Sequence, residues 1–148
     1  MKDEWELQLQ EKFPFMKQNR VDEETNVYRR WGCECSGGWY RLLCDLCQKI
    51  TDRYVEDGLE VDIVVRQVKE KMASLRFYYT HEDIADESKQ SLRDDVARIV
   101  HSYEEKSKTI CEFCGQDGDM RMDMMWKKTL CDRCYGNYLQ KVHERTGR

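Results

Sequence analysis

The chain has 148 residues, which is enough for one ordinary domain or for a core domain with a small appendage. Its net charge of −4 argues against a general nucleic-acid binder, and its 36% of charged residues predicts helices with strongly solvated faces. The sequence has no apolar run long enough to span a bilayer and does not start like a secretion signal, so we expect a cytoplasmic protein without a membrane partner.

The N-terminal part predicts one helix and then a connection. Residues 3–12 have a helical composition, and Pro14 disfavours a helical conformation in the residue before it. The helix should therefore end near Phe13. Residues 18–30 are polar and irregular in their spacing, which indicates a connection.

The middle of the chain predicts a second helix and a small antiparallel sheet. Residues 36–38 give a turn signal, and from Trp39 apolar side chains recur at helical spacing as far as Gly58. Residues 61–71 are rich in β-branched side chains, and residues 74–80 alternate between apolar and polar positions. Both stretches therefore predict strands.

Residues 82–107 predict a long amphipathic helix. Its apolar residues recur three and four positions apart among charged ones, and they are Ile84, Leu92, Val96, Ile99, Val100 and Tyr103. Together these elements predict an α+β fold in which residues 1–107 form a core. Residues 108–148 then form a separate module with a helix at its C-terminal end.

The strongest motif is a pair of C-x2-C sequences, Cys111–Cys114 and Cys131–Cys134, separated by a spacer of 16 residues. This spacing is typical of a tetrahedral zinc site, and Gly115 follows the first pair where a knuckle turn often needs a positive φ. A short strand should lead into a helix whose first turn holds the second pair, an order that resembles a treble-clef-like zinc finger. With four protein ligands the zinc has no open position, so the site is expected to be structural.

Other chemistry for these four cysteines is less favoured. Disulfide frameworks belong mainly to short secreted domains, and two C-x2-C pairs rarely coincide by chance as buried thiols. A redox pair would need only one C-x2-C sequence on a thioredoxin-like fold, which the predicted elements do not form.

A second and less regular group has the pattern C-x-C-x8-C-x2-C and consists of Cys33, Cys35, Cys44 and Cys47. Cys44 and Cys47 lie three apart on the predicted helix, so their sulfurs share a face onto which the turn could fold the other two. This pattern allows a second zinc site. The alternative is that Cys44 and Cys47 are small core residues beside their leucine neighbours.

The remaining motifs do not indicate an enzyme. The sequence contains no H-E-x-x-H, no deaminase motif and no phosphate-binding glycine loop. The aromatic residues 77–79 could stack nucleobases, with Lys69, Lys71 and Arg76 nearby, but a sheet core and a solvated face explain them more simply.

The segment 120–128 suggests a docking surface. Methionine adapts to irregular partner surfaces and tryptophan is favoured in interface hot spots, so the candidate partner-binding residues are Met120, Met122, Trp126, Lys127 and Lys128. The alternative is that Trp126 covers the zinc module.

Several motifs together resemble a family of short, functionally uncharacterised bacterial and phage proteins. They are "KFPFM", "ECSGGWYRLLCDLCQKI", "VVRQVKEKMASLRFYY" and "TICEFCGQDGDM…WKKTLCDRC", and they occur in the family's order over most of residues 11–135. The resemblance implies a zinc-binding accessory protein without a known activity. Two departures are that residues 72–74 replace the family's glycine turn, and that Cys33 and Cys44 are additions.

We therefore expect a non-enzymatic zinc protein of phage or bacterial origin that binds and controls a protein partner, for example as an inhibitor of host defence or transcription. The setting of the resembled family suggests this last step. One alternative is a nucleic-acid-binding regulator that uses the mildly basic residues 108–148. Another is a thiol redox sensor.

Overall fold

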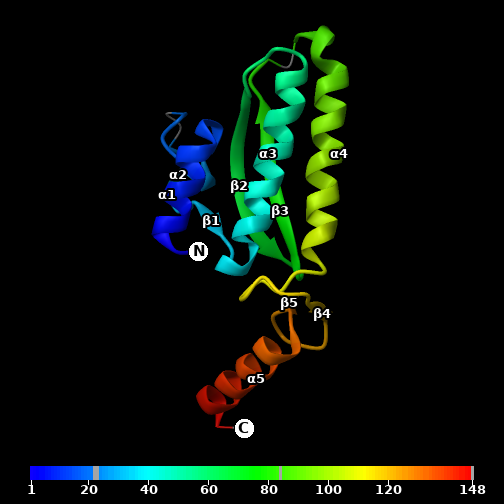
Figure 1. Cartoon of the computed structure of the whole chain (residues 1–148). Helices are drawn as coiled ribbons and strands as arrows, with labels where there is room; N and C mark the ends of the chain where they lie inside the picture. Colours follow the sequence, from blue (N-terminus) through cyan, green and yellow to red (C-terminus); the bar gives the residue numbers. More distant parts are fainter. Residues whose placement is uncertain (22–23, 84, 148) are drawn as a thin grey trace.

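The computed structural model describes residues 1–21, 24–83 and 85–147, and it shows an α+β fold (Figure 1). In chain order the elements are α1 (Asp3–Lys12), η1 (Pro14–Met16), α2 (Val27–Trp31), β1 (Cys33–Glu34), η2 (Gly37–Trp39), α3 (Tyr40–Glu56), β2 (Ile63–Lys71), β3 (Ser74–His81), η3 (Glu87–Lys89), α4 (Gln90–Ser107), β4 (Asp119–Arg121), β5 (Lys128–Leu130) and α5 (Asp132–Thr146). Over the ranges described, no helix combines the length and the apolar character that crossing a bilayer requires.

The main sheet has the strand order β1-β2-β3 and is mixed. The antiparallel pair β2–β3 confirms the two predicted strands, but β1 adds a parallel edge, with Cys33 opposite Val68. The prediction of a purely antiparallel sheet was therefore wrong. The physical reason is the connection, because α3 carries the chain from β1 back to the start of β2, as a crossover between parallel strands must.

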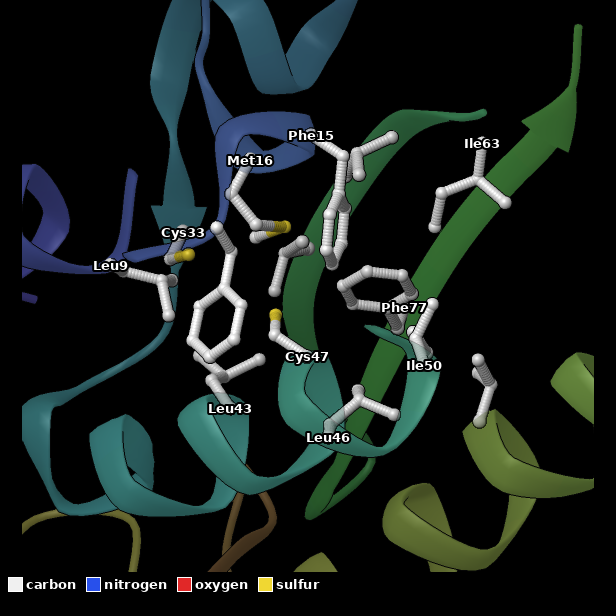
Figure 2. Close-up of a cluster of buried hydrophobic side chains, with 14 of the residues drawn as sticks. Leu9, Phe15, Met16, Cys33, Leu43, Leu46, Cys47, Ile50, Ile63 and Phe77 are labelled. Carbon is white, nitrogen blue, oxygen red and sulfur yellow. The ribbon is translucent and has the colours of Figure 1, made fainter. Parts of the chain in front are cut away.

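The core lies where α3 packs against the sheet and the N-terminal elements close its side. Figure 2 shows Leu43, Leu46 and Ile50 of α3 among side chains from β2, β3 and the N-terminal segment. Proline fixes the tight η1 turn, which turns Phe15 and Met16 inward. The first helix therefore belongs to the core through Leu9, which is fully buried.

The predicted connection at residues 18–30 contains a short helix, α2, which was not predicted. Asn26 begins it, because its side chain accepts a hydrogen bond from the Arg29 amide at 2.9 Å. Tyr28 then turns into the core and donates its hydroxyl to the Met16 carbonyl at 2.6 Å. Five residues are too few to show a helical period, so only the Asn26 cap could have indicated this helix.

The long amphipathic helix is confirmed as α4, but it begins at Gln90 and not at residue 82. Ile84, which was expected on its apolar face, lies outside the described residues. The helix also covers the edge of β3. The Leu75 amide donates to Ser107 Oγ at 2.8 Å, and the Phe77 amide donates to Glu104 Oε2 at 2.9 Å. These side chains satisfy edge-strand donors that would otherwise be open to another chain.

The β2–β3 turn is made by Met72 and Ala73, both of which have positive φ angles, 53° and 69°. A two-residue type I′ turn requires this conformation and strongly prefers glycine or asparagine. For other residues the left-handed region costs roughly 1–2 kcal/mol. The turn is therefore strained at both positions.

Replacing Met72 by glycine is expected to stabilise the protein by about 1 kcal/mol, because the strain is removed and the side chain is largely exposed. Urea denaturation of the two proteins measures this difference. Lys71→Gly is the matched control, since it introduces glycine into a strand and should destabilise the protein. An equal loss of stability in both variants would contradict the strained turn.

Candidate metal centre

The first cysteine pair sits in a knuckle that follows α4 after a connection of residues 108–110. The Cys111 carbonyl accepts a hydrogen bond from the Gly115 amide at 2.9 Å, and the Cys111 amide donates to the Gln116 carbonyl at 2.7 Å. Gly115 has a φ of +82°, as the sequence predicted for this position. The tight turn places the thiols of Cys111 and Cys114 on one side of the knuckle.

The second pair is positioned by β5 and α5. Strand β5 pairs with β4 and ends at Leu130, so Cys131 becomes the N-cap of α5. The Cys131 sulfur accepts a hydrogen bond from the Cys134 amide at 3.4 Å. The cap geometry thus brings both thiols of the second pair to the start of the helix, which carries partial positive charge.

The four thiols of Cys111, Cys114, Cys131 and Cys134 come together, with all their sulfurs within 4.8 Å of one another. The Cys114 and Cys131 sulfurs are 3.7 Å apart. A tetrahedral zinc with bonds of about 2.3 Å requires sulfurs roughly 3.8 Å apart, so the spacing fits that ion. The four residues are therefore close enough to hold a metal ion.

The electrostatics of the cluster favour a cation. Hydrogen bonding from the Cys134 amide lowers the pKa of the Cys131 thiol, whereas burial and the neighbouring thiols raise the pKa of Cys134. Ionised together, the four sulfurs would repel one another strongly at this distance. A divalent cation removes that repulsion and takes thiolates as ligands.

The knuckle is docked on the start of α3 through main-chain contacts. The Gly38 amide donates to the Glu112 carbonyl at 2.7 Å, and Trp39 Nε1 donates to the Ile110 carbonyl at 2.9 Å. A Cβ on Gly38 would lie only 2.3 Å from the Cys111 carbonyl oxygen. The two backbones can approach this closely because residue 38 has no side chain.

A buried ion pair completes this contact. Glu112 is 1% exposed, and its carboxylate accepts from the Ser36 amide at 2.9 Å and from Lys128 Nζ at 3.1 Å. The Thr129 hydroxyl donates to the Ala73 carbonyl at 2.7 Å and so holds the strained β2–β3 turn. The cysteine module therefore contacts both the start of α3 and the tip of the β2–β3 hairpin (Figure 1).

The second cysteine group is not brought together in this way. Cys33, Cys35 and Cys47 lie in the hydrophobic core, and Cys44 is partly buried against it. Burial raises the pKa of the Cys33, Cys35 and Cys47 thiols, so without a metal they are neutral and pack as small apolar side chains. In the part of the chain that the structure describes, no second group of three or more potential ligands is as close as the C-terminal four.

The candidate partner-binding residues are divided between surface and interior. Met122 and Trp126 are exposed, Met120 and Lys127 are half-buried, and Lys128 points to Glu112. No motif in the sequence singles out Glu112, Thr129 or the close approach at Gly38. A charged residue between two cysteine ligands was the only available signal, and it does not reveal its distant partners.

Comparisons of the chain with protein-family models, with curated proteins and with solved structures find no match.

Proposed function

We propose that the chain is a zinc-stabilised accessory protein, without catalytic activity of its own, that binds and controls another protein. The cysteine cluster supports the first part, because its spacing suits zinc and four protein ligands leave no position for a substrate. The order of knuckle, β4–β5 hairpin and an α5 that begins at the second cysteine pair resembles a treble-clef zinc finger, which supports this part of the proposal. The zinc in this proposal is a scaffold.

The observation that carries the second part is the exposure of large apolar side chains on the β4–β5 loop, residues 122–127. Trp126 is 67% exposed and Met125 is 88% exposed, and Met122, earlier in the same loop, is 44% exposed. Exposed apolar side chains grouped in this way mark interaction surfaces, and tryptophan and methionine are both enriched in them.

Contacts with α5 hold the loop in place, which lowers the conformational entropy lost when the loop binds a partner. Met124 is buried, and the Tyr135 hydroxyl of α5 donates to Asp123 Oδ2 at 3.2 Å. The Arg121 guanidinium stacks on the Tyr135 ring at 4.4 Å. A metal at the base of the hairpin would fix α5 and hence the loop.

In this proposal the protein acts sterically or allosterically on its partner. The resemblance to bacterial and phage proteins favours a host cytoplasmic partner in defence or transcription. The alternative of a thiol redox sensor needs an exposed thiol that is free of metal, whereas a zinc ion in the cluster would occupy the four thiols of Cys111, Cys114, Cys131 and Cys134.

Trp126→Ala is expected to weaken partner binding by about 30-fold or more, as loss of a central tryptophan does. The measurement is affinity capture on immobilised, zinc-loaded protein from a bacterial lysate, washed at high salt and quantified by mass spectrometry. Trp31→Ala is the matched control, because Trp31 is 63% exposed on α2. Proteins retained by the control and lost by Trp126→Ala identify the partner; an identical set from both variants would contradict the proposal.

A further inference from the structure

The β2–β3 hairpin has two faces of different character. Leu75 and Phe77 point into the core beneath α3, whereas Tyr78 is 42% exposed on the opposite face. Side chains alternate along a strand, so Arg76 shares that opposite face with Tyr78. The aromatic residues of the segment 77–79 are thus divided, and only Tyr78 presents its ring to solvent on the outer face.

A β-bulge adds an arginine to the outer face. The register of β2 against β3 shifts between Val65 and Gln67, so that Gln67 lies opposite Tyr78 and Val68 opposite Phe77. Arg66 is the extra residue, and its Nε donates to the Thr80 hydroxyl at 3.0 Å. Because Thr80 lies on the same face as Tyr78, the bulge directs Arg66 to the outer face as well.

The resulting cationic sheet face contains Arg66, Lys69, Lys71, Arg76 and Tyr78. Lys69 and Arg76 are directly opposite each other, an arrangement of like charges that destabilises a sheet. Neither Lys69 nor Lys71 has an ion pair with any residue in the described ranges. A concentration of positive charge in a chain of net charge −4 indicates an anionic ligand.

In the described ranges, the acidic residues Glu34 and Glu105 border the cationic sheet face, where the basic side chains outnumber them. Glu34 of β1 lies opposite Lys69, and its carboxylate also accepts a hydrogen bond from Gln67 Nε2 at 3.2 Å. Glu105 of α4 pairs with Lys108 at 2.9 Å. The helices α3 and α4 cover the inner side and the β3 edge (Figure 1), so a ligand reaches the outer face without displacing them.

We infer that the cationic sheet face binds single-stranded nucleic acid. The lysine and arginine side chains would contact phosphates, and one base would stack on the Tyr78 ring, which lies among them. A planar base uses both the ring and the charges, whereas an acidic peptide would use only the charges. With one stacking ring, and with the Gln67 amide beside it already hydrogen-bonded to Glu34, the site would have little sequence preference. This inference is independent of the protein-binding loop at residues 122–127.

The test is fluorescence anisotropy of labelled dT12 and U12 with the zinc-loaded full chain at low and moderate salt. We expect binding that weakens as salt rises. Lys69→Glu should reduce the affinity at least ten-fold, and Tyr78→Ala should reduce it about 5- to 150-fold. Tyr78→Phe should keep most of the affinity. A stronger signal with dT12 or with U12 identifies DNA or RNA as the preferred ligand.

Two charge-matched control variants test whether binding occurs on the cationic sheet face. Lys49→Glu changes an exposed lysine on α3, and Lys141→Glu changes an exposed lysine on α5. Both variants should bind nucleic acid with the affinity of the parent protein. Loss of binding in Lys141→Glu with none in Lys69→Glu would overturn the assignment and favour the basic C-terminal segment. No binding below about 100 μM at low salt would also overturn it. Displacement by polyglutamate with no effect of Tyr78→Ala would show an acidic peptide as the occupant, which overturns the inference too.

Discussion

Cys111→Ser is expected to abolish metal binding and to unfold residues 108–147. The buried apolar side chains of this segment are few, namely Cys111, Met124 and Leu130, and α5 buries none of its residues. Zinc binding in comparable modules contributes about 10–16 kcal/mol, as much as the roughly 5–15 kcal/mol that stabilise a whole domain. Without the ion, the module has too little core to remain folded.

Unfolding of the module should also destabilise residues 36–40 and 71–75, which contact it. The knuckle satisfies the Ser36 and Gly38 amides, and Thr129 holds the carbonyl of the strained residue Ala73. These contacts disappear if the module unfolds. The centre of α3 and its packing against α4 do not depend on the module, so that part of the core should stay folded.

Native mass spectrometry and amide hydrogen exchange measure both effects. The variant should contain no zinc, and exchange protection should be lost in the module and at the two contact sites while the middle of α3 keeps it. Cys44→Ser is the matched control, because Cys44 lies outside the cluster, and it should retain zinc and protection. Unchanged zinc content and protease resistance in Cys111→Ser would refute the structural metal site.

Gly38→Ala is expected to destabilise the protein by at least about 3 kcal/mol, the upper part of the range for overpacking. The added Cβ would lie 2.3 Å from the Cys111 carbonyl oxygen and 2.4 Å from that of Glu112. Both are backbone atoms of the knuckle, so they cannot move aside without opening it. We therefore expect the module to separate from α3.

Urea denaturation and hydrogen exchange of the zinc-loaded protein test this expectation. Protection of the Gly38 and Trp39 amides should fall, and the midpoint of unfolding should decrease. Gly136→Ala is the matched control, because a Cβ at Gly136 meets no atom within 4 Å. Alanine in that exposed helix should stabilise it by about 0.5–1 kcal/mol. If the two variants differ little in stability, the close contact at Gly38 does not hold the module.

Local signals predicted much of the fold. The lone proline marked the end of α1, apolar spacing predicted α3 and α4, and alternation predicted β2 and β3. The start of α4 was placed too early, because the charged residues before it also suit a solvated helix. The helix α2 was missed since five residues are shorter than the window in which a period can be recognised.

The candidate metal centre was predicted from spacing, and the structure confirms that its four cysteines are close together. Spacing alone left two alternatives for the group Cys33, Cys35, Cys44 and Cys47, namely a second zinc site or small residues of the hydrophobic core. Cysteines that lie close together in sequence are compatible with both. These cysteines are buried because α1, η1 and the sheet, which come from other parts of the chain, pack around them. Cysteine is compatible with either environment, so its identity could not distinguish them.

The sequence by itself determined the longer helices and strands and the four clustered cysteines, because helical period, strand alternation and ligand spacing are properties of short segments. Only the tertiary structure decided that β1 runs parallel to β2, that Glu112 pairs with the Ser36 amide, and that Tyr78 faces outward while Phe77 is buried. Ser36 and Glu112 are 76 positions apart. Contacts at that separation depend on how the layers pack and on a β-bulge that changes which side chains share a face, and no local pattern specifies either.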